Sequence, residues 1–327
     1  MTLHELAASV RESIGMAQKG DIQLVTESLS WSVPGPWGSS LVKLGDDCAA
    51  IPDGDGHLLL AIEGMSPELV RLSPRAAGFC SVLVNASDVF AMGGRPIAVV
   101  DALFSGGPDV ANQILEGIHR AASRLGIPVV GGHTNLRSPH TALAVAIVGR
   151  ATSLITSFDA RAGDDIVVGI DMRGRMLPNQ PFWDATDAPA SRMREDYEVL
   201  PTLAEGGLVR AGKDISMGGL AGSLLMLLES SEVGAELVLD RIPCPPDVDL
   251  GRWLSAFPSY GFVLAVEPAR TKQVLAAFAA REITSAVVGS VDASRKLTLS
   301  SRNEREVIWD LAREGLTQSE GARSRHA

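Results

Sequence analysis

Two adjacent carboxylates, Asp46 and Asp47, follow a glycine in the stretch LGDDCAAI at residues 44–51. Near a protein surface, two like charges about 4 Å apart repel by roughly 4 kcal/mol, so either water solvates both or a cation lies between them. Gly45 permits a turn on which both side chains reach one ligand, whereas successive side chains of a strand point to opposite faces. Because Mg²⁺ is usually held by one or two carboxylates and substrate phosphates, the pair indicates either a magnesium site or an exposed acidic turn.

Two further acids stand where regular elements are expected. Glu63 ends the apolar strand HLLLAI, as either a ligand of the same metal or a solvated strand end. Asn85 and Asp88 are three residues apart, hence neighbours on one face of an otherwise apolar helix. Burying an unpaired carboxylate costs several kcal/mol, so Asp88 needs a partner: a metal ion, a phosphate-bound Mg²⁺, or a structural cap or ion pair.

Two glycine pairs complete the polar clusters. Gly93 and Gly94 close the helix that carries Asn85, and they would let backbone amides approach a phosphate. The buried strand IPVV runs into a second set of residues, where two glycines precede polar side chains that suit phosphate contact: Gly131, Gly132, His133, Thr134 and Asn135. A lone histidine at a strand end is also compatible with a purely structural hydrogen bond.

A near match to the phosphate-binding P-loop occurs at residues 207–214, GLVRAGKD. Asp214 occupies the position that requires Ser or Thr, and the preceding residues, TLAEG, are typical of a helix end rather than a strand. The sequence therefore predicts no Walker-type site here.

The elements that must position these residues alternate strands and helices. Asp53-Gly54-Asp55-Gly56 predicts a hairpin turn. Ser73-Pro74 predicts the start of a helix that ends at Gly93; a strand follows at 95–104, a helix at 108–126, and two strands before residue 152. The second half contains further strands and helices, with a polar, proline-bearing loop over 173–188. We expect domains at 1–152 and 153–310, then a disordered tail at 311–327.

Composition excludes several classes of protein. The 327 residues carry a net charge of −10, which disfavours nucleic acid and anionic membranes as partners. The three cysteines form no metal-binding spacing and fit a reducing compartment. The first twenty residues predict an amphipathic helix rather than a signal peptide, and no stretch is long and apolar enough for a membrane span. We expect a cytoplasmic protein.

Taken in order, the motifs LGDDCAAI, NASDVFAMGGRP and GGHTN resemble the aminoimidazole ribonucleotide synthetase (PurM-like) superfamily. The resemblance continues through ARAGDDIVV, DISMGGLAGSLLMLLESS and SYGFVLAV and covers about residues 40 to 300. This superfamily includes thiamine-monophosphate kinase and selenophosphate synthetase. The chain looks most similar to the branch termed AIR synthase-related.

The resemblance implies a fold and a set of site residues. Members fold as two α/β domains: an N-terminal domain that binds ATP and Mg²⁺ and dimerises through a shared β-barrel, and a C-terminal domain with a mixed sheet and helices. It implies metal ligation by Asp46, Asp47, Glu63, Asp88 and Asp214, and catalytic roles for Asp47 and His133. The nucleotide contacts that it implies are Asp46, Asp47, Asn85, Asp88, Gly93, Gly94, Gly131, Gly132, His133, Thr134, Asp214 and Ser216.

Departures from the family pattern bear on the reaction. The kinase-like motif DxSDG appears here as Asp214-Ile215-Ser216-Met217-Gly218, so an acid is replaced by methionine, and Glu63 stands where kinase-like members have aspartate. We expect Mg²⁺-dependent phosphoryl transfer from ATP to an oxygen of a small molecule, in a homodimer. The alternatives are a thiamine-phosphate-kinase-like or selenophosphate-synthetase-like activity, a non-catalytic nucleotide-binding or scaffold subunit, and a metal-free structural dimer.

Overall fold

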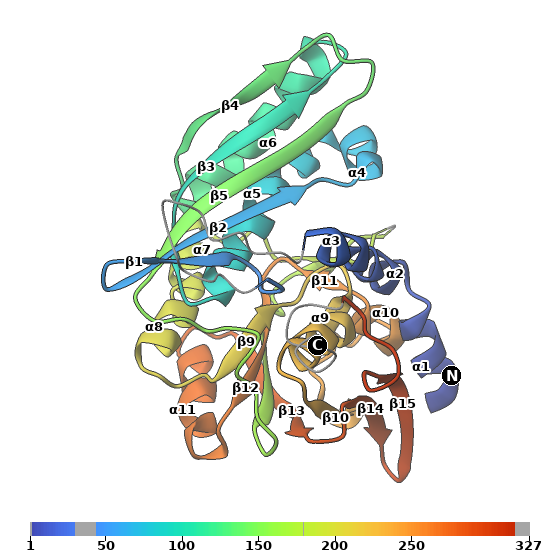
Figure 1. Cartoon of the computed structure of the whole chain (residues 1–327). Coiled ribbons are helices and arrows are strands. Elements are labelled where there is room, and N and C mark those ends of the chain that lie inside the picture. Colours follow the sequence, from blue (N-terminus) through green and yellow to red (C-terminus); the bar gives the residue numbers. More distant parts are fainter. Residues whose placement is uncertain (1, 30–43, 179, 318–327) are drawn as a thin grey trace. The chain divides into compact units, whose positions relative to one another are not determined.

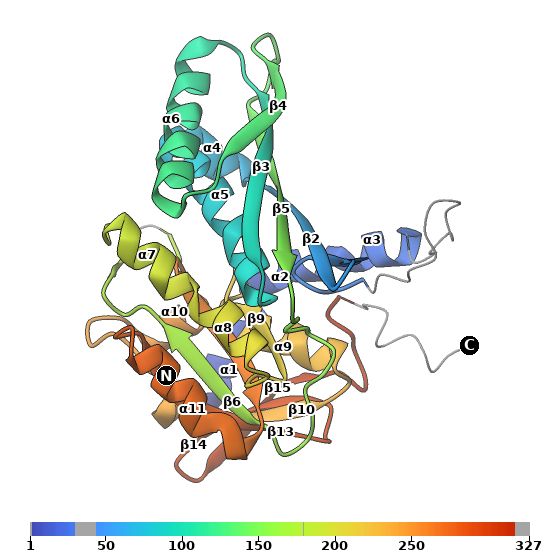
Figure 2. The same cartoon turned by 90° about the vertical axis from the view of Figure 1, so that its left-hand side faces the viewer.

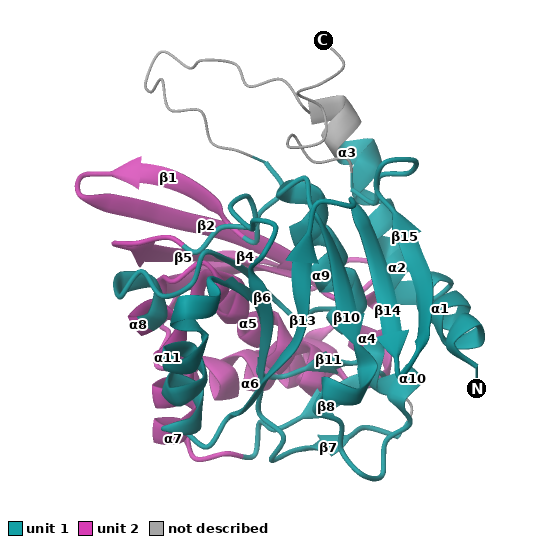
Figure 3. Ribbon diagram, turned by 90° about the horizontal axis from the view of Figure 1, so that it is seen from below, with its two compact units in different colours: residues 1–47, 155–187, 203–327 teal, residues 48–154, 188–202 magenta. Residues whose placement is uncertain are grey.

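The computed structural model describes residues 2–29, 44–178 and 180–317, and the chain forms two compact units (Figure 3). Unit 1 comprises residues 1–47, 155–187 and 203–327, and unit 2 comprises residues 48–154 and 188–202. The mixed α/β fold confirms the expected class. Each unit is therefore built from separate segments of the chain, and the expected division into domains at residue 152 stays a prediction.

Unit 2 is built on a five-stranded sheet of order β1-β2-β5-β3-β4 (Figure 1). Strands β3 and β4 are parallel, and the other neighbours are antiparallel. The predicted hairpin is confirmed: Asp53 pairs with Gly56, and Gly54 has the positive φ of +60° that this turn requires. The strands are β1 (Ala49–Asp53), β2 (Gly56–Gly64), β3 (Arg95–Phe104), β4 (Val129–Asn135) and β5 (Ala142–Ala151).

Helices α5 and α6 cover one face of this sheet (Figure 2). They approach each other at two glycines: a Cβ on Gly78 would overlap the carbonyl of Ile114, and a Cβ on Gly117 would overlap that of Arg75. Because α5 contacts both α6 and strands β2, β3 and β5, it is buried along most of its length. The helices of this unit are α4 (Pro67–Leu72), α5 (Pro74–Ala91), α6 (Pro108–Leu125) and α7 (Ala190–Tyr197).

Unit 1 is built on a seven-stranded sheet of order β15-β14-β10-β13-β6-β12-β9. Two of its inner strands, β6 and β12, are buried almost throughout. Ile166, Val168 and Ile170 of β6 join a core with α1 and α9, while Gly169 on the opposite face packs against Phe278 of α11. The strands are β6 (Asp165–Ile170), β9 (Ala211–Asp214), β10 (Gly234–Val238), β12 (Gly261–Val266), β13 (Thr284–Asp292), β14 (Lys296–Ser301) and β15 (Glu304–Asp310).

The N-terminus of unit 1 forms separate helices instead of the single one expected. Ser13 interrupts the first helix and caps the second, because its Oγ accepts a hydrogen bond from the N–H of Met16 at 3.3 Å. The helices are α1 (Leu3–Arg11), α2 (Ile14–Gly20), α3 (Ile22–Leu29), α9 (Gly219–Ser230), α10 (Leu250–Leu254) and α11 (Pro268–Ala279), with a 3₁₀ turn at Leu239–Arg241; α8 (Val199–Glu205) runs from unit 2 into unit 1.

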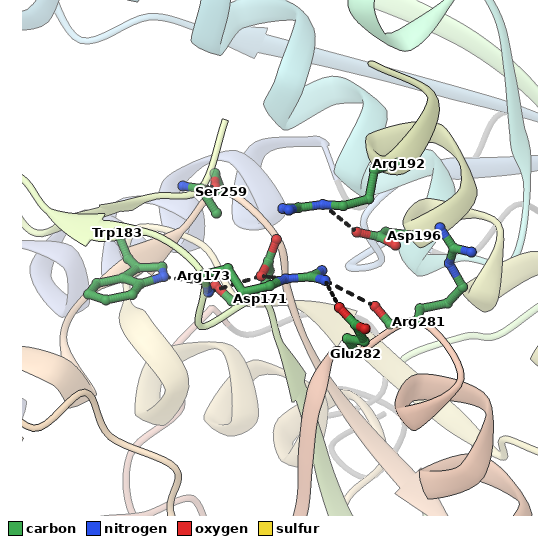
Figure 4. A network of polar contacts seen from close by, with 9 residues as sticks. Asp171, Arg173, Trp183, Arg192, Asp196, Ser259, Arg281 and Glu282 are labelled. Atoms are coloured by element: carbon green, nitrogen blue, oxygen red, sulfur yellow. Dashed lines mark hydrogen bonds and ion pairs between the residues drawn. The ribbon is translucent and has the colours of Figure 1, made fainter. Parts of the chain in front are cut away.

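The segment expected as a loop at 173–188 contains two short strands, β7 (Arg175–Met176) and β8 (Phe182–Asp184). They form a small sheet with β11 (Phe257–Pro258). The indole of Trp183 donates to the carbonyl of Asp171 at 2.8 Å, and the guanidinium of Arg173 bonds the Asp171 carboxylate at 2.7 Å (Figure 4). The apolar packing of Trp183 and these polar contacts order this segment, although its polar, proline-bearing composition predicted a loop.

The expected disordered tail cannot begin at residue 311, because residues 311–317 pack against the rest of unit 1. Leu311 and Leu316 are buried, and the buried carboxylate of Glu229 accepts from the N–H groups of Leu316 and Thr317, each at 2.8 Å. Residues 318–327 lie outside the described part of the chain. Among the described helices, none combines the length and apolar character needed to cross a lipid bilayer.

Candidate metal and nucleotide site

Asp46 anchors the acidic turn of unit 1. Gly45, with φ of +104°, permits the turn. One carboxylate oxygen of Asp46 accepts from the hydroxyl of Ser157 at 2.8 Å and from the N–H of Asp47 at 3.0 Å, and the other accepts from the N–H of Ser157 at 3.0 Å. Both oxygens are therefore engaged, and Asp46 holds the turn against the segment that begins unit 1 again after residue 154.

Asp47 forms a buried ion pair with Lys213. The ammonium of Lys213 donates to Oδ1 of Asp47, and the two side chains are 2% and 5% exposed. Lys213 belongs to β9, an edge strand of the sheet. All four residues of this strand are buried. Oδ2 of Asp47 is also buried but has no hydrogen-bond partner among the described residues. An unsatisfied buried carboxylate oxygen calls for a specific explanation.

Asp214 is the last residue of β9, and Ser216 lies on the loop between β9 and α9. A carboxylate oxygen of Asp214 and one of Asp47 are within 4.8 Å of each other. The N–H of Ser216 donates to the hydroxyl of Ser223 at 3.0 Å, while Oγ of Ser216 is buried with no partner in the described chain. Gly219 has φ of +63°, and a Cβ there would overlap the carbonyl of Leu254, so only glycine lets the loop enter α9 in this way.

Electrostatics couple the four charged residues of this cluster. Burial, and then the charge of Asp47, raise the pKa of Asp46 to about 6, against the opposing effects of Lys213 and Ser157. Burial by itself would lower the pKa of Lys213, but the carboxylates of Asp47, Asp46 and Asp214 outweigh it and raise that pKa above its usual value. Lys213 therefore stays charged and partly neutralises the three acids.

The donor set of the cluster fits a hard divalent cation. Mg²⁺ prefers oxygen ligands and is commonly held by one or two carboxylates. Asp47 supplies a buried oxygen without a partner, and Asp214 supplies a second carboxylate within 4.8 Å of it. Asp46, Asp47 and Asp214 thus lie close to one another in unit 1, and their ligation of a metal stays a prediction.

The remaining acidic and amide candidates lie in unit 2. Asn85 and Asp88 both lie on α5, three residues apart on one helix as predicted, and both are buried. The amide of Asn85 donates to the carbonyls of Ser81 and Val145 at 2.8 and 2.9 Å, and its Oδ1 has no partner in the described residues. Glu63 lies on β2, opposite Val145, and is exposed.

Gly93 and Gly94 do not offer free amides to a phosphate. They form a Schellman cap at the end of α5: the N–H of Gly93 donates to the carbonyl of Phe90 at 2.9 Å, and that of Gly94 to the carbonyl of Val89 at 3.0 Å. Gly93 has φ of +75°, and a Cβ on Gly94 would overlap the side chain of Leu59. The prediction that these amides contact a phosphate is therefore wrong. The two glycines are needed instead for the helix cap and for its packing against Leu59.

Gly131, Gly132, His133 and Thr134 lie on β4, an exposed strand at the end of the sheet of unit 2. A Cβ on Gly132 would overlap Asp101 of the neighbouring strand, so this glycine has a packing role. The ring of His133 packs against Phe104, with centroids 5.7 Å apart. The side chain of Thr134 stays accessible to a ligand.

Comparison with known proteins assigns the chain to a family. Residues 45–151 match the family described as AIR synthase related protein, N-terminal domain, and residues 172–302 match the corresponding C-terminal domain. The chain belongs to the AIR synthase related family. It is 48% identical over 317 residues to an uncharacterized protein of Synechocystis sp., covering 96% of this chain and 98% of the relative. The predicted PurM-like superfamily is thereby confirmed.

Solved structures share the fold of this AIR synthase related protein. T. maritima PurL complexed with ATP has a TM-score of 0.68 and 23% identity, covering 89% of this chain and 52% of that one. The chain thus spans about half the length of that relative. AaThiL complexed with AMPPCP and TMP has a TM-score of 0.65 and 18% identity, covering 86% and 94% of the two chains. At these identities the likeness establishes the two-domain fold.

Sequence reasoning missed two residues of the unit 1 cluster, Lys213 and Ser157. Lys213 stood inside the rejected P-loop match, and rejecting the motif also removed the lysine from consideration. A signal was present, because a lysine among the small residues AGKD of a strand needs a partner once it is buried. For Ser157 no comparable signal exists: it lies 111 positions from Asp46, and folding alone brings the two together.

Proposed function

We propose that this AIR synthase related protein is a Mg²⁺-dependent enzyme that transfers a phosphoryl group from ATP to an oxygen atom of a small molecule. The observation that carries the proposal is the buried, unpartnered oxygen of Asp47 beside Asp214. The ATP complex of T. maritima PurL and the AMPPCP complex of AaThiL support the choice of nucleotide, since both proteins share the fold.

The charged residues of unit 1 have two proposed roles: two of them bind the metal ion, and two of them hold the metal ligands in position. Phosphoryl transfer depends on positioning and charge neutralisation more than on covalent participation of the protein. Asp47 and Asp214 would hold Mg²⁺, which when bound supplies positive charge to the phosphate oxygens. Lys213 fixes the rotamer of Asp47 through their ion pair, and Asp46 fixes the turn by its bonds to Ser157.

The family resemblance implies further metal ligands and nucleotide contacts. Asp88 and Glu63 are proposed as further metal ligands, and Asn85 and Thr134 as nucleotide contacts. His133 is exposed on β4 and is proposed to donate a proton or hydrogen bond near the acceptor. The backbone of Gly131 and Gly132 would lie beside it. These assignments predict that substitution of Asp88 and of Asp47 have the same effect on metal-dependent binding.

The acceptor differs from that of a thiamine-phosphate kinase in this proposal. The second acid of the kinase motif is replaced by Met217, whose side chain is 44% exposed, so no carboxylate is present at this position to bind a metal or a polar substrate. The same feature is compatible with the second candidate function, a non-catalytic subunit that binds nucleotide without turnover. The two candidates share a binding site and differ in whether ATP is consumed.

A thermal-shift titration tests the binding site. We expect ATP with Mg²⁺ to raise the melting temperature of the wild type, ATP with EDTA to raise it far less, and Asp47→Asn to lose the Mg²⁺-dependent part of the shift. Asp247→Asn is the matched control, because Asp247 is exposed in the same unit. An equal shift in wild type and Asp47→Asn would refute the assignment of Asp47.

Release of ADP or AMP, measured with a panel of small-molecule acceptors, separates the two candidate functions. Acceptor-dependent release that Asp47→Asn abolishes supports the enzyme. A Mg²⁺-dependent thermal shift without turnover on any acceptor favours the binding subunit.

A further inference from the structure

The segment that holds the acidic turn (Gly45, Asp46 and Asp47) is irregular and needs a support of its own. Ser157 binds the carboxylate of Asp46 twice, through its N–H at 3.0 Å and through its hydroxyl at 2.8 Å. Residues 155–164, which precede β6, form no helix, and no strand beyond a single bridge at Thr156. Ser157 is fully buried, and buried backbone groups outside regular elements need partners from side chains or from other segments. The position of Asp46 therefore depends on what holds Ser157.

Two consecutive serines at the end of α9 contact this part of unit 1. The hydroxyl of Ser231 donates to the carbonyl of Ser157 at 2.7 Å and accepts from the N–H of Ala160 at 3.1 Å. The hydroxyl of Ser230 donates to the carbonyl of Gly45 at 3.4 Å. Ser231 thus fixes the segment that binds Asp46, and Ser230 contacts the glycine that begins the turn.

The end of α9 is itself held in place. The N–H of Ser231 donates to the carbonyl of Leu227 at 3.0 Å and closes the helix. Glu229 is 1% exposed, and its carboxylate accepts from the N–H groups of Leu316 and Thr317, each at 2.8 Å. Displacing this carboxylate would break charge-assisted hydrogen bonds in a buried place, which is costly. Ser231 therefore lies at a fixed point of unit 1.

The hydrogen bonds of the Ser231 hydroxyl distinguish it from an ordinary helix cap. Both of them go to residues 157–160, and neither goes to the backbone of α9. Without the hydroxyl, the carbonyl of Ser157 and the N–H of Ala160 would each lose this partner, whereas α9 would keep its own hydrogen bonds. The loss would therefore loosen the segment beside Asp46 rather than the helix.

We propose that Ser231 is a positioning residue of the candidate metal and nucleotide site. Through Ser157 it holds Asp46, and Asp46 holds the turn that keeps Oδ2 of Asp47 in place for a metal ion. This inference rests on the proposed function and deepens it: binding of a Mg²⁺–nucleotide at Asp47 would depend on a serine that acts through other residues of unit 1.

Hydrogen–deuterium exchange of the metal-free full chain tests the positioning role without any ligand. The N–H groups of Asp47 and Ser157 both donate to Asp46, so their exchange reports on the turn and on its support. We expect both to exchange about tenfold faster in Ser231→Ala, which is the order of effect of one lost hydrogen bond. The amides of α11 should not change, because that helix packs on the face of the sheet opposite to α9.

A thermal-shift titration with ATP and Mg²⁺ tests the consequence for binding. Ser231→Ala should lose most of the Mg²⁺-dependent shift of the wild type, and Ser231→Thr, which keeps the hydroxyl, should recover it. Ser294→Ala is the matched control, because the hydroxyl of Ser294 also accepts a backbone N–H, that of Lys296 at 3.2 Å, and is exposed in the same unit. This control should keep the wild-type exchange and the wild-type shift.

The outcomes separate this inference from the proposed function. Unchanged exchange at Asp47 and Ser157 in Ser231→Ala, or a full Mg²⁺-dependent shift in that variant, overturns the role of Ser231, and the metal site stands as long as Asp47→Asn loses its shift. Exchange that is equally faster in α11 shows a general loss of stability and also overturns the role of Ser231. A wild type without a Mg²⁺-dependent shift overturns the proposed function and this inference together. If Ser231→Ala does not fold, Ser231→Cys, whose thiol is only a weak donor, replaces it with the same expected results.

Discussion

The charge state of Asp46 makes the stability of the metal-free protein depend on pH. Burial and the neighbouring Asp47 raise the pKa of Asp46 to about 6 in the folded state, against roughly 3.9 in an unfolded chain. Between these values the folded state binds more protons, so the free energy of unfolding falls as pH rises from about 4 to 6. Two pKa units correspond to about 3 kcal/mol at most.

Asp46→Asn should remove this dependence while keeping an oxygen acceptor for Ser157. Urea unfolding in EDTA at pH 5 and pH 7.5 checks it: we expect the wild type to lose stability between these pH values more steeply than the variant. Parallel curves for the two proteins would show that Asp46 does not titrate in this range.

The buried pair of Lys213 and Asp47 predicts strong coupling between the two positions. Removing one partner of a buried ion pair leaves an uncompensated charge and costs about 3–5 kcal/mol. Lys213→Met and Asp47→Asn should each destabilise the metal-free protein, and the double variant should be less unstable than the sum of the single changes. Chemical denaturation of the four proteins gives the coupling energy, and additive effects would contradict the pair.

How much of the site could be predicted depends on the residue. Asp46 and Asp47 stand out in the sequence as adjacent acids behind a glycine, whereas Asp214 was named as a ligand through the family resemblance alone. The amides of Gly93 and Gly94 were misassigned, because a glycine pair after a helix is equally the mark of a Schellman cap. The role of Lys213 depends on its burial and on its ion pair with Asp47, which is 166 positions away. No local sequence pattern contains either piece of information.

At the scale of elements, the close contact of α5 and α6 predicts that the stability of the protein depends strongly on Gly78. A Cβ at Gly78 would overlap the backbone of α6 at Ile114, which cannot move without shifting the helix. Gly78→Ala should therefore destabilise the protein by about 1–3 kcal/mol, as overpacking does. Gly64→Ala is the control, because no atom lies within 4 Å of that Cβ. Equal melting temperatures of the two variants would contradict the packing argument.

Elements with strong periodicity were predictable, and those defined by their neighbours were not. The strand at residues 95–104 and the helix that begins at Pro108 match their predictions, because hydrophobic spacing and Pro and Gly boundaries mark them. Strand β9 was missed, since its sequence AGKD has no strand character, and it is ordered by pairing with β12. The short strands β7 and β8 are likewise ordered by tertiary contacts of Trp183.

For the whole molecule, the sheet of unit 2 carries an exposed apolar row on one of its faces. Ile62 of β2 and Val100 of β3 are 68% and 41% exposed. Both pair with Ala146 of β5, so they lie in one row across the sheet and on one face. This is the face opposite to the side chains of Val145 and Ile147, which are buried. Exposed apolar rows of this kind mark interaction surfaces.

The homodimer that the resemblance implies would bury this row, and Ile62→Lys tests it. A charge at the centre of such an interface would be desolvated without a partner, so the variant should run as a monomer in size-exclusion chromatography with light scattering, where the wild type runs as a dimer. Leu115→Lys is the matched control, because Leu115 is 40% exposed on α6, a helix that covers the other side of the sheet. A dimer that persists in Ile62→Lys would place the interface elsewhere, and a monomeric wild type would mean that the apolar row has a different partner.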